Sequence, residues 1–185
     1  MDIFKHHRNS RMEMEEVYFW TTTVKDWKQL LKPDKYKTIL IDLLADLVQK
    51  EQMAVYGFVI MPNHAHILLE LLNMNGKEKP HASFQKASSH AIVKDLKLNH
   101  PQVLAHFSVA EPDRQYRIWQ ANPLAIRMDT KMKASQKLDY IHNNPLQERW
   151  NLAKRPEEYA WSSAAFYQTN HSQFDFLTRY EERFG

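Results

Sequence analysis

Residues 53–72 of the chain read MAVYGFVIMPNHAHILLELL, and this stretch decides the fold. It holds two apolar runs, 53–61 and 64–72, each of strand length and rich in β-branched or aromatic side chains. Pro62 and Asn63 separate the runs and predict a turn or kink. A link this short cannot carry a parallel crossover, so the two strands are expected to be antiparallel.

The helices and strands predicted on both sides of this hairpin follow one another in an order that is characteristic of a known fold. Upstream, residues 17–24 (VYFWTTTV) predict a strand, and residues 34–51 predict a helix with apolar side chains at helical spacing. Downstream, residues 83–98 predict a second helix, and the alternating run 116–120 (YRIWQ) predicts a fourth strand. This is the order of a ferredoxin-like α/β plait. The predicted fold class is therefore α+β with a central antiparallel sheet, extended by a C-terminal helix.

The length bounds the domain organisation. The chain has 185 residues and a mass of 22.1 kDa, and we find no internal repeat, so a single domain is expected over residues 1–185. Within it, we expect about residues 1–14 to form a flexible basic arm and about residues 168–185 to form a tail. The absence of cysteine excludes a disulfide scaffold and a thiolate metal site.

Composition excludes several classes of function. With three glycines in the chain, neither a dinucleotide-binding G-x-G-x-x-G motif nor a P-loop occurs. The formal net charge of +3 and the isoelectric point near 9.0 permit a polyanionic partner. The run 53–61 is too short to span a bilayer, and the N-terminus lacks the apolar segment of a signal peptide. We therefore expect no membrane partner and a cytoplasmic location.

His64 and His66 stand two apart on a predicted strand, so their side chains leave the same face. Two imidazoles on one face can hold a single metal ion or a phosphate oxygen. The alternative is a pair of ordinary polar residues on a half-exposed strand. Two other H-x-H chemistries fail: the amidohydrolase barrel needs about 250 residues, and a nucleotide hydrolase with a histidine triad needs a third alternate histidine where Leu68 stands.

Tyr140 lies on a third predicted helix, which opens at Asp129 or Thr130 and reaches about residue 143. It falls away from the apolar stripe of that helix, beside Lys133 and Lys137. A surface tyrosine with a packed ring is the alternative interpretation. Asn144 follows one turn later as a candidate metal ligand, although the residue before a proline disfavours the helical region.

Three motifs in order carry a family resemblance. MPNHAHILL (61–69) resembles the HUH motif of the single-tyrosine transposases, in which two histidines flank a hydrophobic residue. YIHNNP (140–145) resembles their tyrosine helix in the form of the REP-associated tyrosine transposases, and RPEEYAWSS (155–163) is similar to the segment that follows it there. The chain departs from the family in having LQERW (146–150) where a more basic, glycine-containing stretch is common.

The resemblance implies a metal-dependent single-stranded DNA endonuclease and strand transferase. It assigns Tyr140 as the nucleophile that keeps the 5′ end as a phosphotyrosine. It assigns His64 and His66 as ligands of Mg²⁺ or Mn²⁺, with Asn144 as the candidate third protein ligand. It also implies that the partner is single-stranded DNA with REP-like hairpins, and it favours a monomer over a homodimer.

Basic side chains supply candidate DNA contacts. A stripe on the second predicted helix has spacings of four, four and three residues, and a solvated helix face is its alternative interpretation. Two alternative functions remain open: a non-catalytic nucleic-acid-binding plait, and a small phosphoesterase that uses the histidines alone. Retention of both histidines and the tyrosine favours the transposase-like enzyme over a pure binder. The full set of candidate DNA-binding residues is Lys86, His90, Lys94, Lys97, Lys133, Lys137 and Arg117.

Overall fold

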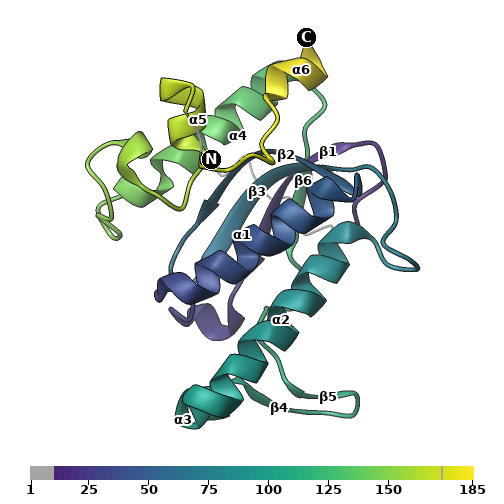
Figure 1. Cartoon of the computed structure of the whole chain (residues 1–185), viewed down its shortest axis with the longest axis vertical. Helices are drawn as coiled ribbons and strands as arrows, with labels where there is room; N and C mark the ends of the chain where they lie inside the picture. The colour runs from purple at the N-terminus through teal and green to yellow at the C-terminus, as the bar shows by residue number, and fades with distance from the viewer. Residues whose placement is uncertain (1–10, 172) are drawn as a thin grey trace, which may run out of the picture.

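A computed structural model describes residues 11–171 and 173–185, and its centre is a four-stranded sheet (Figure 1). The strands are β1 (Val17–Thr23), β2 (Met53–Ile60), β3 (His64–Leu71) and β6 (Leu124–Arg127), in the order β2-β3-β1-β6. Every neighbouring pair is antiparallel. The predicted α+β plait and the predicted 53–72 hairpin are therefore confirmed.

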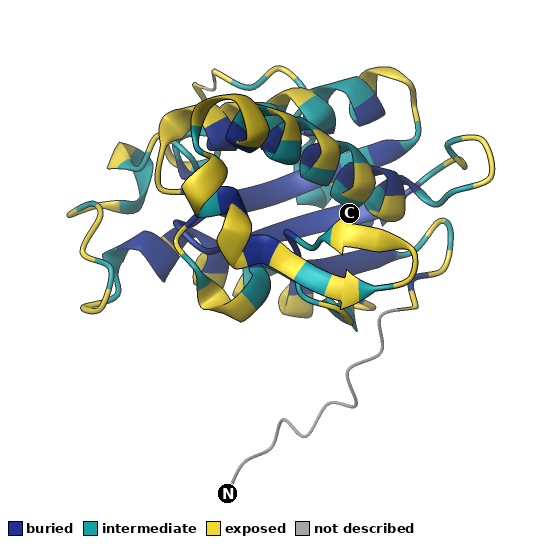
Figure 2. Ribbon diagram, turned by 90° about the horizontal axis from the view of Figure 1, so that it is seen from below, coloured by how far each residue is buried: buried dark blue, intermediate teal, exposed yellow. Residues whose placement is uncertain are grey.

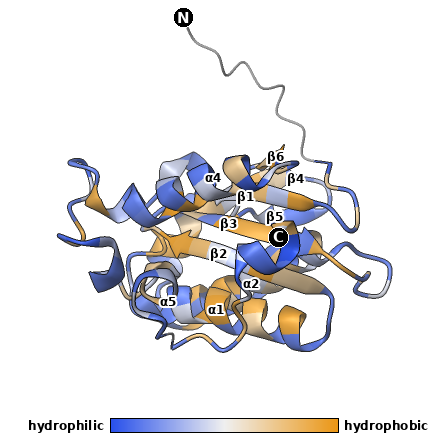
Figure 3. Cartoon of the chain, turned by 90° about the horizontal axis from the view of Figure 1, so that it is seen from above, coloured by the Kyte–Doolittle hydropathy of each residue, from blue (hydrophilic) through white to orange (hydrophobic). Residues whose placement is uncertain are grey.

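Helices cover both faces of this sheet. The helices α1 (Asp34–Gln49) and α2 (Pro80–Asn99) lie on one face, and α4 (Lys131–Asn143) lies on the other (Figures 1 and 3). All residues of β3 are buried because the strand is central and covered on both sides. In Figure 2 the sheet is dark blue, whereas the outer sides of the helices are exposed.

The strand period decides which side chain enters which layer. Ile67 and Leu69 belong to the apolar cluster shared with α1 and α2. Leu68 points the other way and belongs to the cluster shared with Leu138 and Ile141 of α4. The face of β3 that carries His64 and His66 is therefore the face beneath α4.

Gly57 lets α4 approach the sheet closely. The pairing of β2 with β3 shifts between Val55 and Gly57, and a Cβ atom at Gly57 would collide with Leu138 Cδ1 of α4. The helix itself begins after Thr130, whose side chain accepts a hydrogen bond from the backbone N–H of Lys133. The predicted opening of this helix is confirmed at Thr130.

The expected strand at 116–120 is wrong. The fourth strand of the sheet is β6, which pairs with the free edge of β1, while Tyr116 ends a short strand of a separate ribbon. Ile118 and Trp119 are buried, and Trp119 donates its indole N–H to Ser88 Oγ. This segment meets the end of β1 through one isolated bridge between Val24 and Trp119 and forms no strand there. The alternation in YRIWQ therefore corresponds neither to a strand of the sheet nor to alternate burial, since the consecutive Ile118 and Trp119 are both buried.

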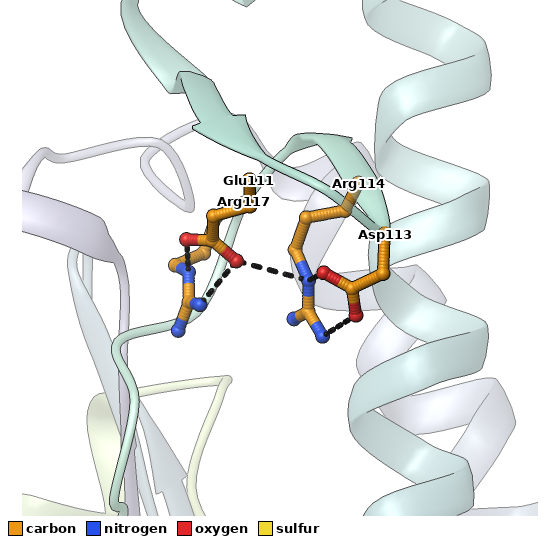
Figure 4. Close-up of polar contacts among 4 residues, drawn as sticks. All are labelled: Glu111, Asp113, Arg114 and Arg117. Atoms are coloured by element: carbon orange, nitrogen blue, oxygen red, sulfur yellow. Dashed lines mark hydrogen bonds and ion pairs between the residues drawn. The ribbon is translucent and has the colours of Figure 1, made fainter.

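Shorter elements complete the chain. The ribbon of β4 and β5 projects beside α2, and Figure 4 shows the carboxylates of Glu111 and Asp113 paired with Arg114 and Arg117 there. No helix among the described residues combines the length and the apolar character needed to cross a membrane. The remaining elements are η1 (Lys25–Trp27), α3 (Pro101–Leu104), η2 (Ala105–Phe107), β4 (Ser108–Glu111), β5 (Arg114–Tyr116), η3 (Asn144–Leu146), η4 (Pro156–Glu158), α5 (Ala164–Thr169) and α6 (Tyr180–Phe184).

The C-terminal segments cover the edge strand β2. The backbone N–H of Ile60 donates to Trp161 O at 2.9 Å, and the N–H of Ser163 donates to Phe58 O at 2.9 Å. Such cover removes an exposed edge that would otherwise pair with another chain. At the other end, residues 1–10 of the expected arm lie outside the described residues. Met12 is fully buried in the core, so the arm does not extend to it.

Candidate active site

The two histidines lie together on β3. His64 and His66 project from the same face, their ring centroids are 4.6 Å apart, and their exposed fractions are 3% and 7%. The predicted shared face is therefore confirmed. The half-exposed strand of the alternative interpretation is not what the structure shows, because α4 covers this face.

Neighbouring polar groups orient both rings. His66 Nδ1 lies 2.8 Å from Thr21 Oγ1 on the paired strand. His64 Nδ1 lies 2.6 Å from Asn63 Oδ1, and Asn63 uses its amide nitrogen to donate to the carbonyl of Trp27 at 3.1 Å. Asn63 Oδ1 must then accept from Nδ1–H of His64, which leaves a lone pair on His64 Nε2. Neither Nε2 atom has a hydrogen-bond partner among the described residues.

Burial keeps the histidines neutral. Loss of solvent lowers the pKa of His64 to about 4, and the positive charge of Arg149 adds to the effect. Burial also holds the pKa of His66 well below its usual value, with further contributions from His64 and Lys137. A neutral imidazole is the form that binds a metal ion. At neutral pH the pair is therefore ready to act as ligands.

Tyr140 lies beside this pair. The centroid of its ring is 5.4 Å from that of His66 and 6.0 Å from that of Phe19, whereas 41% of the residue is exposed. Lys137 Nζ, one turn earlier on α4, lies 5.5 Å from the Tyr140 ring centroid. Burial lowers the pKa of Lys137. The tyrosine thus combines a ring packed on the site with access from solvent.

Asn144, the candidate third metal ligand, has a buried carboxamide without a hydrogen-bond partner among the described residues. It is fully buried, and neither polar atom of its side chain has a hydrogen-bond partner in the described part of the chain. A buried unpaired polar group costs about 1–3 kcal/mol, so its presence calls for a functional explanation. Despite Pro145, Asn144 is helical, with φ −57° and ψ −44°, and so continues the turn begun at Tyr140.

The donor set fits a divalent cation. No cluster of three His, Cys, Asp or Glu side chains occurs in the described part of the chain. A metal ion on the histidine pair would therefore need its third protein ligand from elsewhere, and the unpaired carboxamide of Asn144 is suited to that role.

A cavity of about 340 Å³ opens beside the site. His66, Lys137 and Tyr140 line one part of it, and the rest is lined by β1, Trp27, β6 and the loop before β6. Sequence reasoning did not single out most of its residues. Thr21 could not be found from the sequence, because only the register of β1 against β3 brings it to His66. For Asn63 there was one local signal, its position in the Pro62–Asn63 pair directly before His64. The residues missed include Phe19, Thr21, Thr23, Trp27, Asn63, Gln120 and Asn122.

The basic candidates are divided between two layers. Lys137 lines the cavity, while Lys133 is paired with Asp129 at 2.7 Å. Arg117 is paired with Glu111 at 2.6 Å in the distant ribbon (Figure 4).

The α2 stripe lies exposed in the layer across the sheet from the histidine face. One of its members, Lys86, is paired with Glu78 at 2.7 Å. The structure thus gathers the histidines, Tyr140 and Lys137, but does not bring the stripe to them. A DNA-binding role of the stripe stays a prediction. Its members are Lys86, His90, Lys94 and Lys97.

Comparisons with known proteins identify the fold. No protein-family model and no curated protein matches the sequence. Among solved structures, the chain matches a REP-associated tyrosine transposase bound to a REP hairpin, with 15% identity and a TM-score of 0.57, over 97% of this chain and 98% of that one. A protein of Deinococcus radiodurans R1, provisionally assigned as a transposase, matches at 18% identity over 72% of this chain and 94% of that one, with a TM-score of 0.41. The chain therefore has the fold of a REP-associated tyrosine transposase along nearly its whole length.

Proposed function

We propose that this protein is a metal-dependent endonuclease and strand transferase for single-stranded DNA, and that it acts through a covalent phosphotyrosine. The observation that carries the proposal is the placement of Tyr140, whose ring lies 5.4 Å from that of His66 at the mouth of an open cavity. The shared fold with a transposase supports it.

Tyr140 Oη is the attacking atom. It forms a bond to the scissile phosphorus while the bond from phosphorus to the 3′ oxygen breaks. The phenol loses its proton, and the departing 3′ oxygen gains one, so that a free 3′ hydroxyl and a 5′ phosphotyrosine result. One phosphodiester replaces another, so the reverse attack by a 3′ hydroxyl can join strands. Lys137 places a positive charge beside the phosphate during both steps.

The remaining site residues position these groups. His64, His66 and Asn144 would hold Mg²⁺ or Mn²⁺, which would polarise a phosphate oxygen and neutralise developing charge. Thr21 and Asn63 fix the two imidazoles through their Nδ1 atoms, as outer-shell partners of metal-binding histidines do.

We also propose that the substrate is a DNA hairpin with a single-stranded flank, because the matching transposase is bound to a REP hairpin. A monomer suffices for this reaction. Tyr140 and His66 of the same chain meet, so a second copy need not contribute the nucleophile.

The test is covalent capture. An oligonucleotide hairpin from the flanks of the gene, incubated with the protein and Mn²⁺ or Mg²⁺, should give a protein–DNA adduct that survives denaturing electrophoresis. Tyr140→Phe should abolish the adduct, because only the nucleophilic oxygen is removed. His64→Ala and chelation by EDTA should abolish it as well. Tyr116→Phe, on the distant β5, is the matched control and should leave the adduct unchanged.

Two outcomes would replace this proposal. Cleavage by Tyr140→Phe would show that another nucleophile, such as water, attacks the phosphate, as in a phosphoesterase. Tight hairpin binding with no cleavage in either metal would indicate a non-catalytic binding plait.

A further inference from the structure

Trp27 is a large aromatic residue left exposed at the candidate site. It is 56% exposed, it lines the cavity, and its ring centroid lies 6.2 Å from that of His64. An indole that contributes so little to the core is available to a ligand.

The backbone holds Trp27 in this place at a conformational cost. Asp26 and Trp27 both have a φ of 56°, in the left-handed region that side chains with a Cβ disfavour. Two hydrogen bonds maintain it: the N–H of Trp27 donates to Val24 O at 3.0 Å, and Asn63 Nδ2 donates to Trp27 O at 3.1 Å. A strained backbone that its surroundings hold in place is typical of functional sites.

Apart from Lys137, the rest of the cavity wall is apolar or carries uncharged polar groups. Thr21, Thr23, Gln120 and Asn122 supply hydroxyls and amides, and Lys137 is the charged side chain among the described lining residues. The cavity of about 340 Å³ lies within the range of small-ligand sites. An indole face beside neutral donors and acceptors suits a flat, uncharged heterocycle with polar edges.

We propose that Trp27 and this cavity bind an unpaired nucleobase of single-stranded DNA next to the phosphate attacked by Tyr140. The base stacks on the Trp27 indole, and the amides of Gln120 and Asn122 accept and donate hydrogen bonds at its edge. The inference rests on the proposed function, because that function brings single-stranded DNA to the site.

Binding can be measured apart from cleavage. The probe is a fluorescein-labelled single-stranded oligonucleotide of mixed sequence, titrated in EDTA so that no cleavage occurs. Trp27→Asn removes the indole with a residue that accepts the left-handed backbone. It should raise Kd by about 5- to 150-fold, the loss of one base–aromatic stack. Trp27→Phe keeps a ring and should stay close to wild type, and so should the control Leu98→Asn on α2, where Leu98 is 74% exposed.

Salt dependence and fluorescence identify the kind of contact. Stacking neutralises no phosphate, so the slope of log Kd against log salt should be the same for Trp27→Asn as for wild type. Indole fluorescence should be quenched by DNA in the wild type, and this quenching should be smaller in Trp27→Phe.

The two proposals fail in different ways. If the wild type forms the Tyr140 adduct but Trp27→Asn binds the probe as tightly as the wild type, base stacking is wrong and the catalytic proposal stands. A weakened Trp27→Asn with a shallower salt slope, or a wild type that does not bind the probe, would also overturn the stacking proposal. Trp27-dependent binding without any adduct would instead contradict the catalytic proposal.

Discussion

The substitution Gly57→Ala tests whether close packing against β2 holds α4 over the histidine face. A methyl group added there would overlap Leu138 Cδ1 and would lie 3.2 Å from Ser163 Oγ. Leu138 is 5% exposed and packed between α4 and the sheet, so it has little room to move aside. Overpacking of a core contact costs about 1–3 kcal/mol. We therefore expect Gly57→Ala to lower the free energy of unfolding by about 2 kcal/mol and to displace α4 outward.

Urea denaturation measures the first effect, and adduct formation measures the second. With a denaturant slope of about 2 kcal/mol per molar, the urea midpoint should fall by about 1 M. The rate of adduct formation should fall by about tenfold or more, since a shift of about 1 Å at reacting groups can cost about 100-fold.

A double-mutant cycle isolates the contact. Leu138→Ala alone should cost about 2–5 kcal/mol through the cavity that it leaves. Added to Gly57→Ala, it removes the overlap, so the double variant should be more stable than the sum of the single losses by about 1–2 kcal/mol. Additive losses, or an unchanged urea midpoint in Gly57→Ala, would refute the close approach of α4 to β2.

Four further predictions address single features of the site and the surface. Asn144→Leu removes two buried polar atoms that lack a partner among the described residues, so in EDTA it should raise the free energy of unfolding by about 1 kcal/mol. If Asn144 is a metal ligand, Mn²⁺ should raise the Tm of the wild type but not that of the variant, and a destabilised variant in EDTA would contradict the assignment. Lys137→Met should slow adduct formation by about tenfold and reduce the salt slope of DNA binding by ~0.7, the value of one single-strand phosphate contact. Burial lowers the pKa of His81 to about 4, so the unfolded chain binds the proton more readily than the folded one. The contribution of His81 to stability should be full above about pH 6.5 and should fall as the pH is lowered toward 4. Urea midpoints measured across this range should decline less steeply in His81→Gln. Replacement of Lys86, Lys94 and Lys97 by alanine should reduce the salt slope by ~2 if the α2 stripe contacts the DNA backbone, and an unchanged slope would show a solvated helix face.

The local pattern of the sequence determined the elements and the direction of their side chains. Alternation along residues 64–71 places His64 and His66 on one face, because successive side chains of a strand point to opposite sides. Helical spacing likewise separates Tyr140 from the buried Leu138 and Ile141 on α4. These inferences depend on geometry within one element, which neighbours in the fold do not change.

Tertiary structure decided which elements meet. The strand expected at 116–120 has the right alternation, but the free edge of β1 is occupied by β6. The α2 stripe has the right spacing, but the layer in which α2 packs lies across the sheet from the histidine face. Thr21 and Trp27 join the site through strand register and a strained loop. Periodicity shows which side of an element is buried, whereas contacts between residues distant in the chain determine what that side is buried against.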